Sequence, residues 1–348
     1  MGPEAAAFDH VVVDALHPDP AVIDQLGTSL RAGSLVAFPT ETVYGIGAAI
    51  DRPDALRRIF EVKGRPRTDP LIVHVADESA LEGVVDRVPS SARALAAAFW
   101  PGPLTIVLGR GPLIGDEVTA NGPSVGVRVP AHPVAERLLR AAGIGVAAPS
   151  ANRFGRISPT TAEDVITDLG AHLRHGDAVV DAGPTPLGIE STVVDLTGDR
   201  PAILRHGGVP LEDVTAVIGD VDGSERRVTP EETASAAPGG LLRHYAPNTP
   251  LVLVEGDRDL LDRLVVGLDG RGVHAGVVDL PSEAAGAAAV LYRRLRQADG
   301  SGADVLLAAA LAPAGLGRGI NDRLFRAAHG VVVLDSSPAT LERLVALR

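Results

Sequence analysis

The chain has no cysteine among its 348 residues, which excludes thiol catalysis, disulfides and cysteine-based zinc sites. Aromatic residues make up only 3%, so the hydrophobic cores must be built from valine, leucine, isoleucine and alanine. No apolar run approaches the roughly 18 residues of a membrane span, and the sequence does not begin like a signal peptide. The formal net charge of −12 argues against strong direct binding to nucleic acid. We therefore expect a soluble cytoplasmic protein without membrane contact.

Lysine is almost absent as well. Lys63 is the only lysine among 32 basic residues, and all the others are arginine. Lysine is a compact point charge on a flexible stem, whereas arginine is a broad planar fork. A tight phosphate pocket that needs one movable charge favours lysine. The alternative is an accident of composition.

The hydrophobic pattern divides the chain into two parts joined by a polar segment, and two domains are also expected from the length. Residues 8–210 mix short apolar runs with helical segments, which predicts an α/β domain with a mixed sheet. Residues 211–249 are assigned to a linker, because Gly, Pro, Ser, Thr and charge dominate its later part. Residues 250–348 show a regular strand–helix alternation, typical of a small Rossmann-like domain.

The expected elements follow from apolar runs and helical periodicity. In the first domain, the predicted strands are 34–38, 71–75, 104–108, 124–129, 145–148, 178–181 and 192–196. The predicted helices there are 20–33, 51–62, 78–99, 132–142 and 161–173. In the second domain, strands are predicted at 251–254, 274–280, 305–309 and 331–335.

Two polar runs follow apolar segments of the first domain. The run 38–47 is dense in hydroxyls and glycines, which predicts a turn that offers donors to a small polar ligand, or a purely structural turn. Ser150 and Asn152 lie two residues apart on an extended segment and therefore point the same way. They could both reach a phosphate or an amino-acid group, or they could cap the next segment.

Arg128 is a single arginine within an apolar strand. Burying it there is costly unless it meets an anion, and the natural partner is a carboxylate held by two hydrogen bonds. The alternative is an edge strand at the surface. The segment 188–192 adds a hydroxyl pair, and Arg205 adds another cation, both near strand ends.

The linker contains one unusual stretch, Leu241-Leu242-Arg243-His244-Tyr245-Ala246-Pro247. It brings apolar, cationic and aromatic side chains into a segment that is otherwise polar. It either anchors the linker to a domain or forms a lid over a ligand site, because long ordered loops are often functional.

Together these motifs resemble the Sua5/YrdC/YwlC family of L-threonylcarbamoyladenylate synthases. The resemblance rests on Lys63-Gly64-Arg65, Ser150-Ala151-Asn152 and the segments 38–47, 99–105 and 188–195. The segments 243–247 and 315–324 resemble the longer, two-domain Sua5 form. The resemblance implies a YrdC-like catalytic domain with a twisted mixed sheet, then a linker acting as a lid, then a Sua5-type C-terminal domain.

The resemblance also implies an activity. A nucleotidyltransferase reaction would join L-threonine, bicarbonate and ATP into threonylcarbamoyl-AMP and release pyrophosphate. The product would pass to the tRNA threonylcarbamoyl transferase machinery, which makes the t6A modification of tRNA. Mg²⁺ is expected to enter with ATP, and no residue of the chain is assigned as a metal ligand.

The family's site residues transfer to the matching positions of this sequence. The catalytic set implied by the two short motifs is Lys63, Arg65, Ser150 and Asn152. The implied threonine-binding residues are Thr42, His74, Arg128, Ala148 and Ser191. The implied ATP-binding residues are Arg65, Asp69, Ser124, Ser150, Ser158, Arg205, His244 and Tyr245. Asp69 departs from the family's usual asparagine, and because a carboxylate repels phosphates, its alternative partners are a ribose hydroxyl or a magnesium ion.

Two other functions remain as alternatives. A non-catalytic RNA-binding module would use Lys63 and its arginine neighbours, but the net charge and the scarcity of stacking aromatics count against it. A carbamoyl-handling domain of a hydrogenase-maturation protein shares this module. That larger protein carries zinc-finger cysteines, which this chain lacks.

Overall fold

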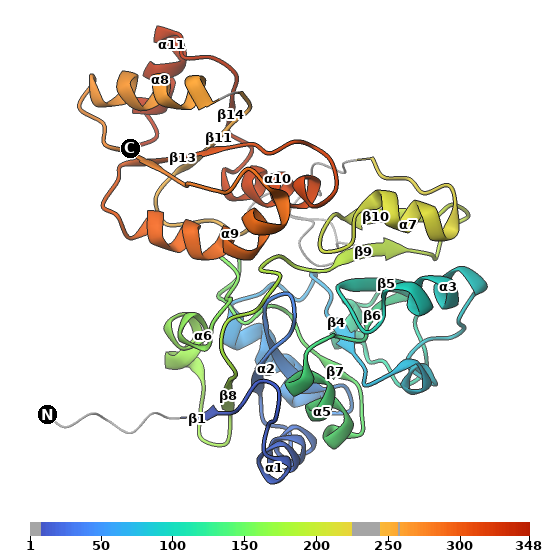
Figure 1. The fold of residues 1–348 in the computed structure, drawn as a ribbon. Coiled ribbons are helices and arrows are strands. Elements are labelled where there is room, and N and C mark those ends of the chain that lie inside the picture. The colour runs from blue at the N-terminus through green and yellow to red at the C-terminus, as the bar shows by residue number, and fades with distance from the viewer. Residues whose placement is uncertain (1–7, 225–243, 257) are drawn as a thin grey trace, which may run out of the picture. The chain divides into compact units, whose positions relative to one another are not determined.

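The computed structural model describes residues 8–224, 244–256 and 258–348 (Figure 1). The described residues form two compact units. The first comprises 8–154 and 158–224, and the second comprises 155–157, 244–256 and 258–348. The stretch Leu241-Leu242-Arg243 of the expected lid or anchor lies outside the described residues. Within the described ranges, no helix is long and apolar enough to cross a membrane.

The first unit is built on a 10-stranded sheet with the order β1-β8-β2-β3-β7-β4-β6-β5-β9-β10. The pairs β1–β8, β2–β8, β4–β6 and β5–β9 are parallel, and the other neighbours are antiparallel. This mixed sheet confirms the predicted fold class. The strands are β1 (Asp9–Val12), β2 (Val36–Pro39), β3 (Tyr44–Ala49), β4 (Ile72–His74), β5 (Leu104–Gly109), β6 (Ser124–Arg128), β7 (Val146–Ala147), β8 (Ala178–Asp181), β9 (Thr192–Asp195) and β10 (Ala202–Arg205).

The helices of the first unit mostly follow the predicted ranges. They are α1 (Pro20–Arg31), α2 (Pro53–Lys63), α3 (Ser90–Phe99), α4 (Asp116–Thr119), α5 (Pro133–Ala142), α6 (Ala162–Leu169) and α7 (Leu211–Ile218), with 3₁₀ turns η1 (Glu78–Leu81) and η2 (Gly170–His172). The single helix predicted at 78–99 was wrong. The chain forms η1 and then α3, whose N-cap is Pro89, because proline has no N–H to continue a helix.

Strand β3 was not predicted, because its glycines at 45 and 47 were interpreted as part of a turn. The turn is confined to the residues before it, where the Thr40 hydroxyl donates to the Val43 carbonyl at 2.7 Å. A Cβ at Gly47 would lie 2.9 Å from the Phe38 ring on the neighbouring strand. The glycine therefore permits β2 and β3 to pair beneath a large aromatic side chain.

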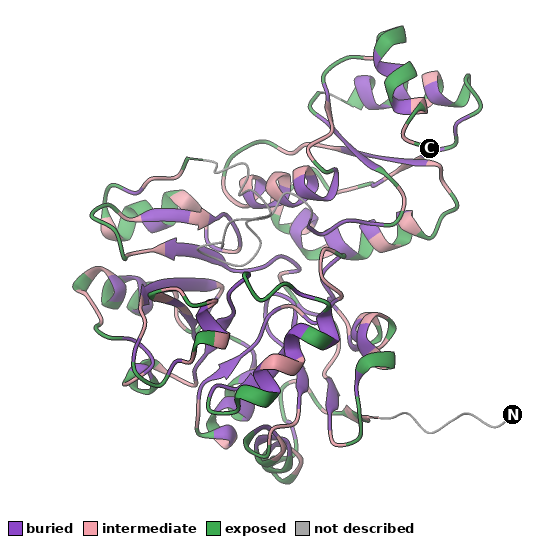
Figure 2. Cartoon of the chain, turned by 180° about the vertical axis from the view of Figure 1, so that it is seen from behind, coloured by how far each residue is buried: buried purple, intermediate pink, exposed green. Residues whose placement is uncertain are grey.

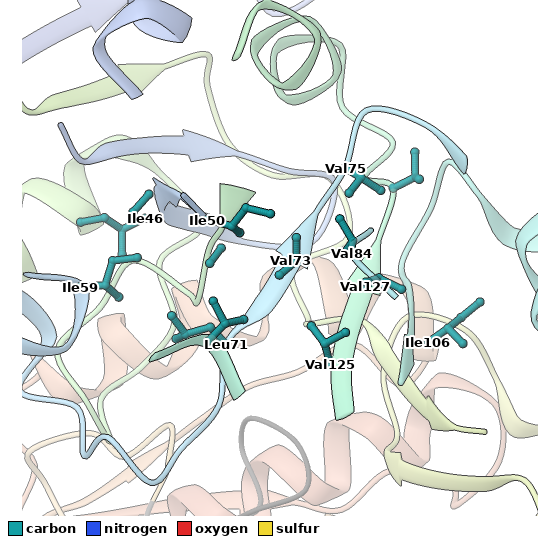
Figure 3. Close-up of a cluster of buried hydrophobic side chains, with 14 of the residues drawn as sticks. Ile46, Ile50, Ile59, Leu71, Val73, Val75, Val84, Ile106, Val125 and Val127 are labelled. Atoms are coloured by element: carbon teal, nitrogen blue, oxygen red, sulfur yellow. The ribbon is translucent and has the colours of Figure 1, made fainter. Parts of the chain in front are cut away.

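One face of the sheet is covered by helices α2, α3 and α6. The core cluster on this face includes Val73, Val127 and Ile106 from the central strands (Figure 3). Leu56 and Leu95 belong to the same cluster and come from the covering helices. These five residues are buried, and Figure 2 shows that the strands of the sheet are mostly coloured as buried. This face holds most of the apolar core of the unit.

The opposite face is covered differently along the sheet. Helices α1 and α5 pack side by side (Figure 1) and bury residues of β2, β7 and β8, including Phe38 and Val146. No described side chain of β4, β5 or β6 belongs to that cluster. The central strands are therefore free to carry polar side chains on this face.

The second unit has a 4-stranded parallel sheet with the order β12-β13-β11-β14. Its strands are β11 (Leu251–Val254), β12 (Ala275–Val277), β13 (Val305–Ala309) and β14 (Val332–Val333), and its helices are α8 (Arg258–Asp269), α9 (Ala284–Asp299), α10 (Leu316–Ala327) and α11 (Pro338–Val345). Helices α8 and α11 share one apolar cluster with β11 and β13, and α9 packs against α10. This is the predicted Rossmann-like alternation.

Candidate active site

The alternation of side chains along the central strands separates a polar face from the core. Val73 and Val127 point into the core cluster, so the next residues, His74 and Arg128, point to the opposite side. The strand register places His74 directly opposite Arg128. By the same argument Thr105, the neighbour of the core residue Ile106, points to this side. We call the His74, Arg128 and Thr105 side of β4, β5 and β6 the polar face.

Arg128 is held rigidly on the polar face although it is only 4% exposed. Its Nη2 lies 2.7 Å from Oε1 of Glu41 in an ion pair and donates to the Thr42 hydroxyl at 3.1 Å. Its Nε donates to the Gly102 carbonyl at 3.2 Å. The sequence argument that a strand arginine needs a carboxylate is therefore met within the chain, by Glu41.

One edge of the Arg128 guanidinium is left over. Its Nη1 makes no hydrogen bond within the described residues, and it is not among their buried unpartnered atoms. The nitrogen is therefore accessible, and it is a cationic donor on the polar face. A second carboxylate could approach it without displacing Glu41.

His74 lies beside Arg128 and is 4% exposed. Burial, with the Arg128 charge as second cause, lowers the pKa of His74 to about 3, so the ring is neutral at pH 7. Its Nδ1 has no hydrogen-bond partner among the described residues. Because a buried nitrogen without a hydrogen bond is costly, a ligand on the polar face that bonded to it would remove that cost.

The two short motifs meet at Lys63, the last residue of α2. Its Nζ donates to the Ser150 carbonyl at 2.6 Å and also to the Asn152 carbonyl. Gly64 ends the helix with φ 63°, which turns the chain back so that the Lys63 carbonyl accepts the Phe154 N–H at 2.8 Å. Burial, followed by the charge of Arg65, lowers the pKa of Lys63 well below its usual value.

Arg65 is buried close to Lys63 and supports its own loop. It donates to the carbonyls of Asp69 and Pro70 at 3.2 and 2.7 Å, and its Nη2 lies 3.0 Å from the Asp69 carboxylate. Burial raises the pKa of Asp69, and the Arg65 charge opposes that change. The carboxylate that replaces the family's amide is therefore compensated by a neighbouring guanidinium.

Ser150 continues the strand region next to β3. It forms a bridge with Gly45, and the next residue, Ala151, donates its N–H to the Tyr44 carbonyl at 2.8 Å. The Ser150 hydroxyl makes no hydrogen bond within the described part of the chain. It is therefore available as a short donor or acceptor.

The ends of β9 and β10 bring together a second polar group. The Ser191 hydroxyl contacts the Thr105 hydroxyl at 2.8 Å and accepts from Arg205 Nη2 at 3.0 Å. Arg205 also donates to the Ser191 carbonyl at 2.9 Å. A Cβ at Gly207 would lie 2.3 Å from the Glu190 carbonyl, so only glycine permits this close approach. Ser191 thus joins Thr105 on the polar face.

Three further predicted residues have different surroundings. Ser158 is fully buried and donates to Glu190 Oε1 at 2.6 Å. Ala148 packs in the α1/α5 cluster, and its N–H is bound to the Ile72 carbonyl at 3.0 Å. Ser124 begins β6, at the opposite end of the strand from Arg128, and lines a groove of about 560 Å³ with Ser91 and Thr197.

His244 and Tyr245 belong to the second unit. Tyr245 is 1% exposed, has φ 62°, and stacks on Tyr292 with a ring separation of 5.7 Å. The Arg323 guanidinium lies 5.4 Å from the Tyr245 ring centre. The His244 ring lies 4.0 Å from the Tyr245 ring. Tyr245 is therefore packed within its own unit, and the contact of either side chain with ATP stays a prediction.

The sequence interpretation missed the carboxylates of the site. Glu41 pairs with Arg128, and Glu190 accepts from Ser158. A signal was present for Glu41, since it lies between the two threonines of the 38–47 run and a buried strand arginine requires an anion. No local signal marked Glu190, because its partner is 32 residues away in the sequence.

The described ranges contain no group of three or more histidine, aspartate or glutamate side chains placed to hold a metal ion. The buried carboxylates of Glu41 and Asp69 each face an arginine. A divalent cation would therefore receive few ligands from the chain itself.

Fold and site define an α/β protein with a polar face that suits a small carboxylate ligand, next to a cluster of buried cations. Comparison with protein families identifies it further. The Sua5/YciO/YrdC model, described as "Telomere recombination", matches residues 28–207. A model described as "Threonylcarbamoyl-AMP synthase, C-terminal domain" matches residues 209–329. The chain belongs to the Sua5/YciO/YrdC family, as the sequence motifs indicated.

Named relatives cover almost the whole chain. A threonylcarbamoyl-AMP synthase of Bacillus subtilis is 38% identical over 92% of this chain and 97% of its own length. One from Pyrococcus abyssi is 40% identical over 86% of this chain and 91% of its own length. The crystal structure of P. abyssi Sua5 complexed with L-threonine matches with a TM-score of 0.87 at 37% identity, over 94% of this chain and 99% of that one. These matches confirm the two-part α/β fold.

Proposed function

We propose that this chain is an L-threonylcarbamoyladenylate synthase, an enzyme of the nucleotidyltransferase class. The neutral amine of threonine attacks bicarbonate and forms a carbamate, with loss of water. A carbamate oxygen then attacks the α-phosphorus of ATP and forms threonylcarbamoyl-AMP, and the bond to pyrophosphate breaks. Support comes from relatives with that name that match along nearly their full length.

The observation that carries the proposal is the accessible edge of Arg128 beside His74. A threonine carboxylate fits the Nη1 side of the guanidinium, because charged hydrogen bonds of this kind are short and strong. The unmet Nδ1 of His74 and the hydroxyls of Thr42 and Ser191 lie on strands or turns at the same face and can contact the polar atoms of threonine. The P. abyssi relative was solved complexed with L-threonine.

The phosphates of ATP are assigned to the cations of the neighbouring cluster. Arg65 and Arg205 supply positive charge in a region of low exposure, where charge that builds up on phosphoryl oxygens is stabilised most. Lys63 also fixes the backbone that carries Ser150 and Asn152. Ser124 and its groove, Ser158, Asp69 and the second unit's His244 and Tyr245 complete the proposed ATP contacts.

Orientation is the second contribution of the site. The reaction joins three substrates, and holding reactants in line can remove about 7–11 kcal/mol of the barrier in well-oriented systems. Arg128 suits this task because contacts within the chain hold one side of its guanidinium in place. One side is bound by Glu41 and Thr42, and the other is accessible.

Magnesium fits the site only as part of the nucleotide substrate. Mg²⁺ usually keeps several waters and is held by phosphate oxygens with one or two carboxylates. The described residues offer no three-ligand group, and Asp69 is paired with Arg65. When bound with ATP, the ion would neutralise phosphate charge, and the arginines would orient the triphosphate.

We further propose that the product serves the t6A modification of tRNA in the cytoplasm, where ATP, bicarbonate and tRNA are all present. Threonylcarbamoyl-AMP is an activated acyl adenylate, so a transferase must accept it and carry the threonylcarbamoyl group to tRNA. Direct contact between this chain and tRNA is not required by the reaction.

The test is an omission assay with the full chain, in which pyrophosphate release is measured with ATP, threonine and bicarbonate. Omitting threonine or bicarbonate is expected to reduce release to background, and mass spectrometry should detect threonylcarbamoyl-AMP only in the complete mixture. Pyrophosphate release that does not depend on threonine would contradict the proposal. So would binding of RNA without any product, which is the behaviour of the alternative RNA-binding module.

A further inference from the structure

Glu41 is a buried carboxylate that pairs with Arg128, the cation of the polar face that is proposed to bind threonine. Glu41 is 8% exposed and lies in the turn between β2 and β3. Its Oε1 is 2.7 Å from Arg128 Nη2, and its Oε2 accepts the Ala131 N–H at 3.0 Å. The two oxygens therefore tie the Arg128 side chain to the backbone that follows β6.

Backbone contacts fix Glu41 independently of its side chain. Its carbonyl accepts the Leu187 N–H at 2.9 Å, and the carbonyl of Thr42 accepts the Gly188 N–H at 3.2 Å. The segment that carries Glu41 is thus bonded to the loop before Ser191. A carboxylate anchored in this way can hold the guanidinium of Arg128 in one orientation.

We infer that Glu41 is a positioning residue for threonine, acting through Arg128. It holds the Nη2 side of the guanidinium and so presents the Nη1 side to the substrate carboxylate. This inference rests on the proposed function and adds a residue and a role to it. Glu41 makes no contact with the reacting atoms.

The competing possibility is that threonine displaces Glu41 from Arg128. Displacement would leave a buried carboxylate without its counter-charge, which is strongly unfavourable. The accessible Nη1 makes displacement unnecessary, because a second carboxylate can bind there while the first stays. Glu41 and threonine are therefore expected to occupy opposite sides of the same guanidinium.

Glu41→Gln is the informative variant, because glutamine has a similar shape but only one acceptor oxygen. That oxygen can still accept the Ala131 N–H, but the uncharged amide cannot form the ion pair with Arg128. The guanidinium should lose its fixed orientation. We expect the KM for threonine to rise at least tenfold, the KM for ATP to change less than threefold, and Glu41→Asp to recover part of the loss.

The matched control is Asp177→Asn, which alters another buried carboxylate that faces an arginine. Asp177 is 1% exposed and pairs with Arg58 at 2.5 Å, away from the polar face. Both variants should lower the melting temperature. Only Glu41→Gln should change the ratio of the two KM values, since a purely structural loss would affect threonine and ATP alike.

The experiment compares full-length parent, Glu41→Gln, Glu41→Asp and Asp177→Asn in the pyrophosphate-release assay, with threonine and ATP each titrated. A selective increase in the threonine KM for Glu41→Gln supports the inference. An unchanged or lower threonine KM overturns it, the latter by showing that Glu41 competes with substrate. If Glu41→Gln does not fold, Glu41→Asp is titrated in its place: a selective but smaller increase in the threonine KM supports the inference, and an unchanged or lower threonine KM overturns it. A parent without threonine-dependent release would refute the proposed function instead.

Discussion

Replacing Lys63 by arginine keeps the positive charge and changes only its shape. The Nζ of Lys63 lies within hydrogen-bond distance of two carbonyls, those of Ser150 and Asn152, and the side chain is 1% exposed. A guanidinium is wider and planar, so it cannot occupy the position of a single nitrogen between two carbonyls. We expect it to push the 150–152 segment away from α2.

The expected destabilisation can be worked out from these contacts. A buried carbonyl left without its donor costs about 1–3 kcal/mol, and two are affected. Overpacking a filled site typically adds about 1–3 kcal/mol. The total is about 3–9 kcal/mol. Since each kcal/mol shifts the melting temperature by about 2–4 °C in domains of 150–250 residues, the shift should be at least about 6 °C.

The assay has two readouts, thermal unfolding and threonine-dependent pyrophosphate release. Lys63→Arg should lower both the melting temperature and, at a temperature where it is folded, the turnover at least a hundredfold. Arg58→Lys, which changes a cation elsewhere in the unit, is the control for altered basic residues. A Lys63→Arg protein with parental melting temperature and turnover would refute the reasoning about this site.

Three other predictions concern the polar face. Arg128→Lys should raise the threonine KM more than the ATP KM, because a charged hydrogen bond is worth about 1.5–3 kcal/mol; equal effects on both would argue against a carboxylate contact. Gly207→Ala should reduce activity more than tenfold, since its Cβ would lie 2.6 Å from the Ser191 carbonyl, whereas Gly300→Ala, with 3.6 Å to its nearest neighbour, should not. His74 has a folded pKa of about 3, below its unfolded value, so the unfolded state binds more protons and stability should be lost as pH falls from about 6.5 towards 3. Denaturant titrations should show that His74→Asn removes that part of the pH dependence; an unchanged slope would contradict a buried neutral ring.

The sequence was informative where the signal is local. The strands 251–254 and 305–309 of the second unit were predicted to the residue, because short apolar runs between helical segments have few other interpretations. The meeting of Lys63 with Ser150 and Asn152 was expected only through the family resemblance, and the contacts bear out that closeness.

The sequence was less informative where distant residues decide the outcome. Strand β3 is rich in small residues whose role depends on Phe38 and Val146 of neighbouring strands. The partner of Arg128 is 87 positions before it, and a carboxylate within the chain could not be told from one on a ligand. Lys63 was expected to face phosphates, but it donates to backbone carbonyls. We expect Lys63 to contribute to activity through the 150–152 segment that it fixes, which the Lys63→Arg assay tests.

The central claim is that the accessible edge of Arg128 receives the carboxylate of threonine. Calorimetric titration of the full chain with L-threonine and with L-threonine amide, whose carboxylate is replaced by a neutral amide, tests it most directly. The account predicts that the amide binds at least tenfold more weakly, corresponding to about 1.4 kcal/mol. Equal affinities for the two ligands would contradict it.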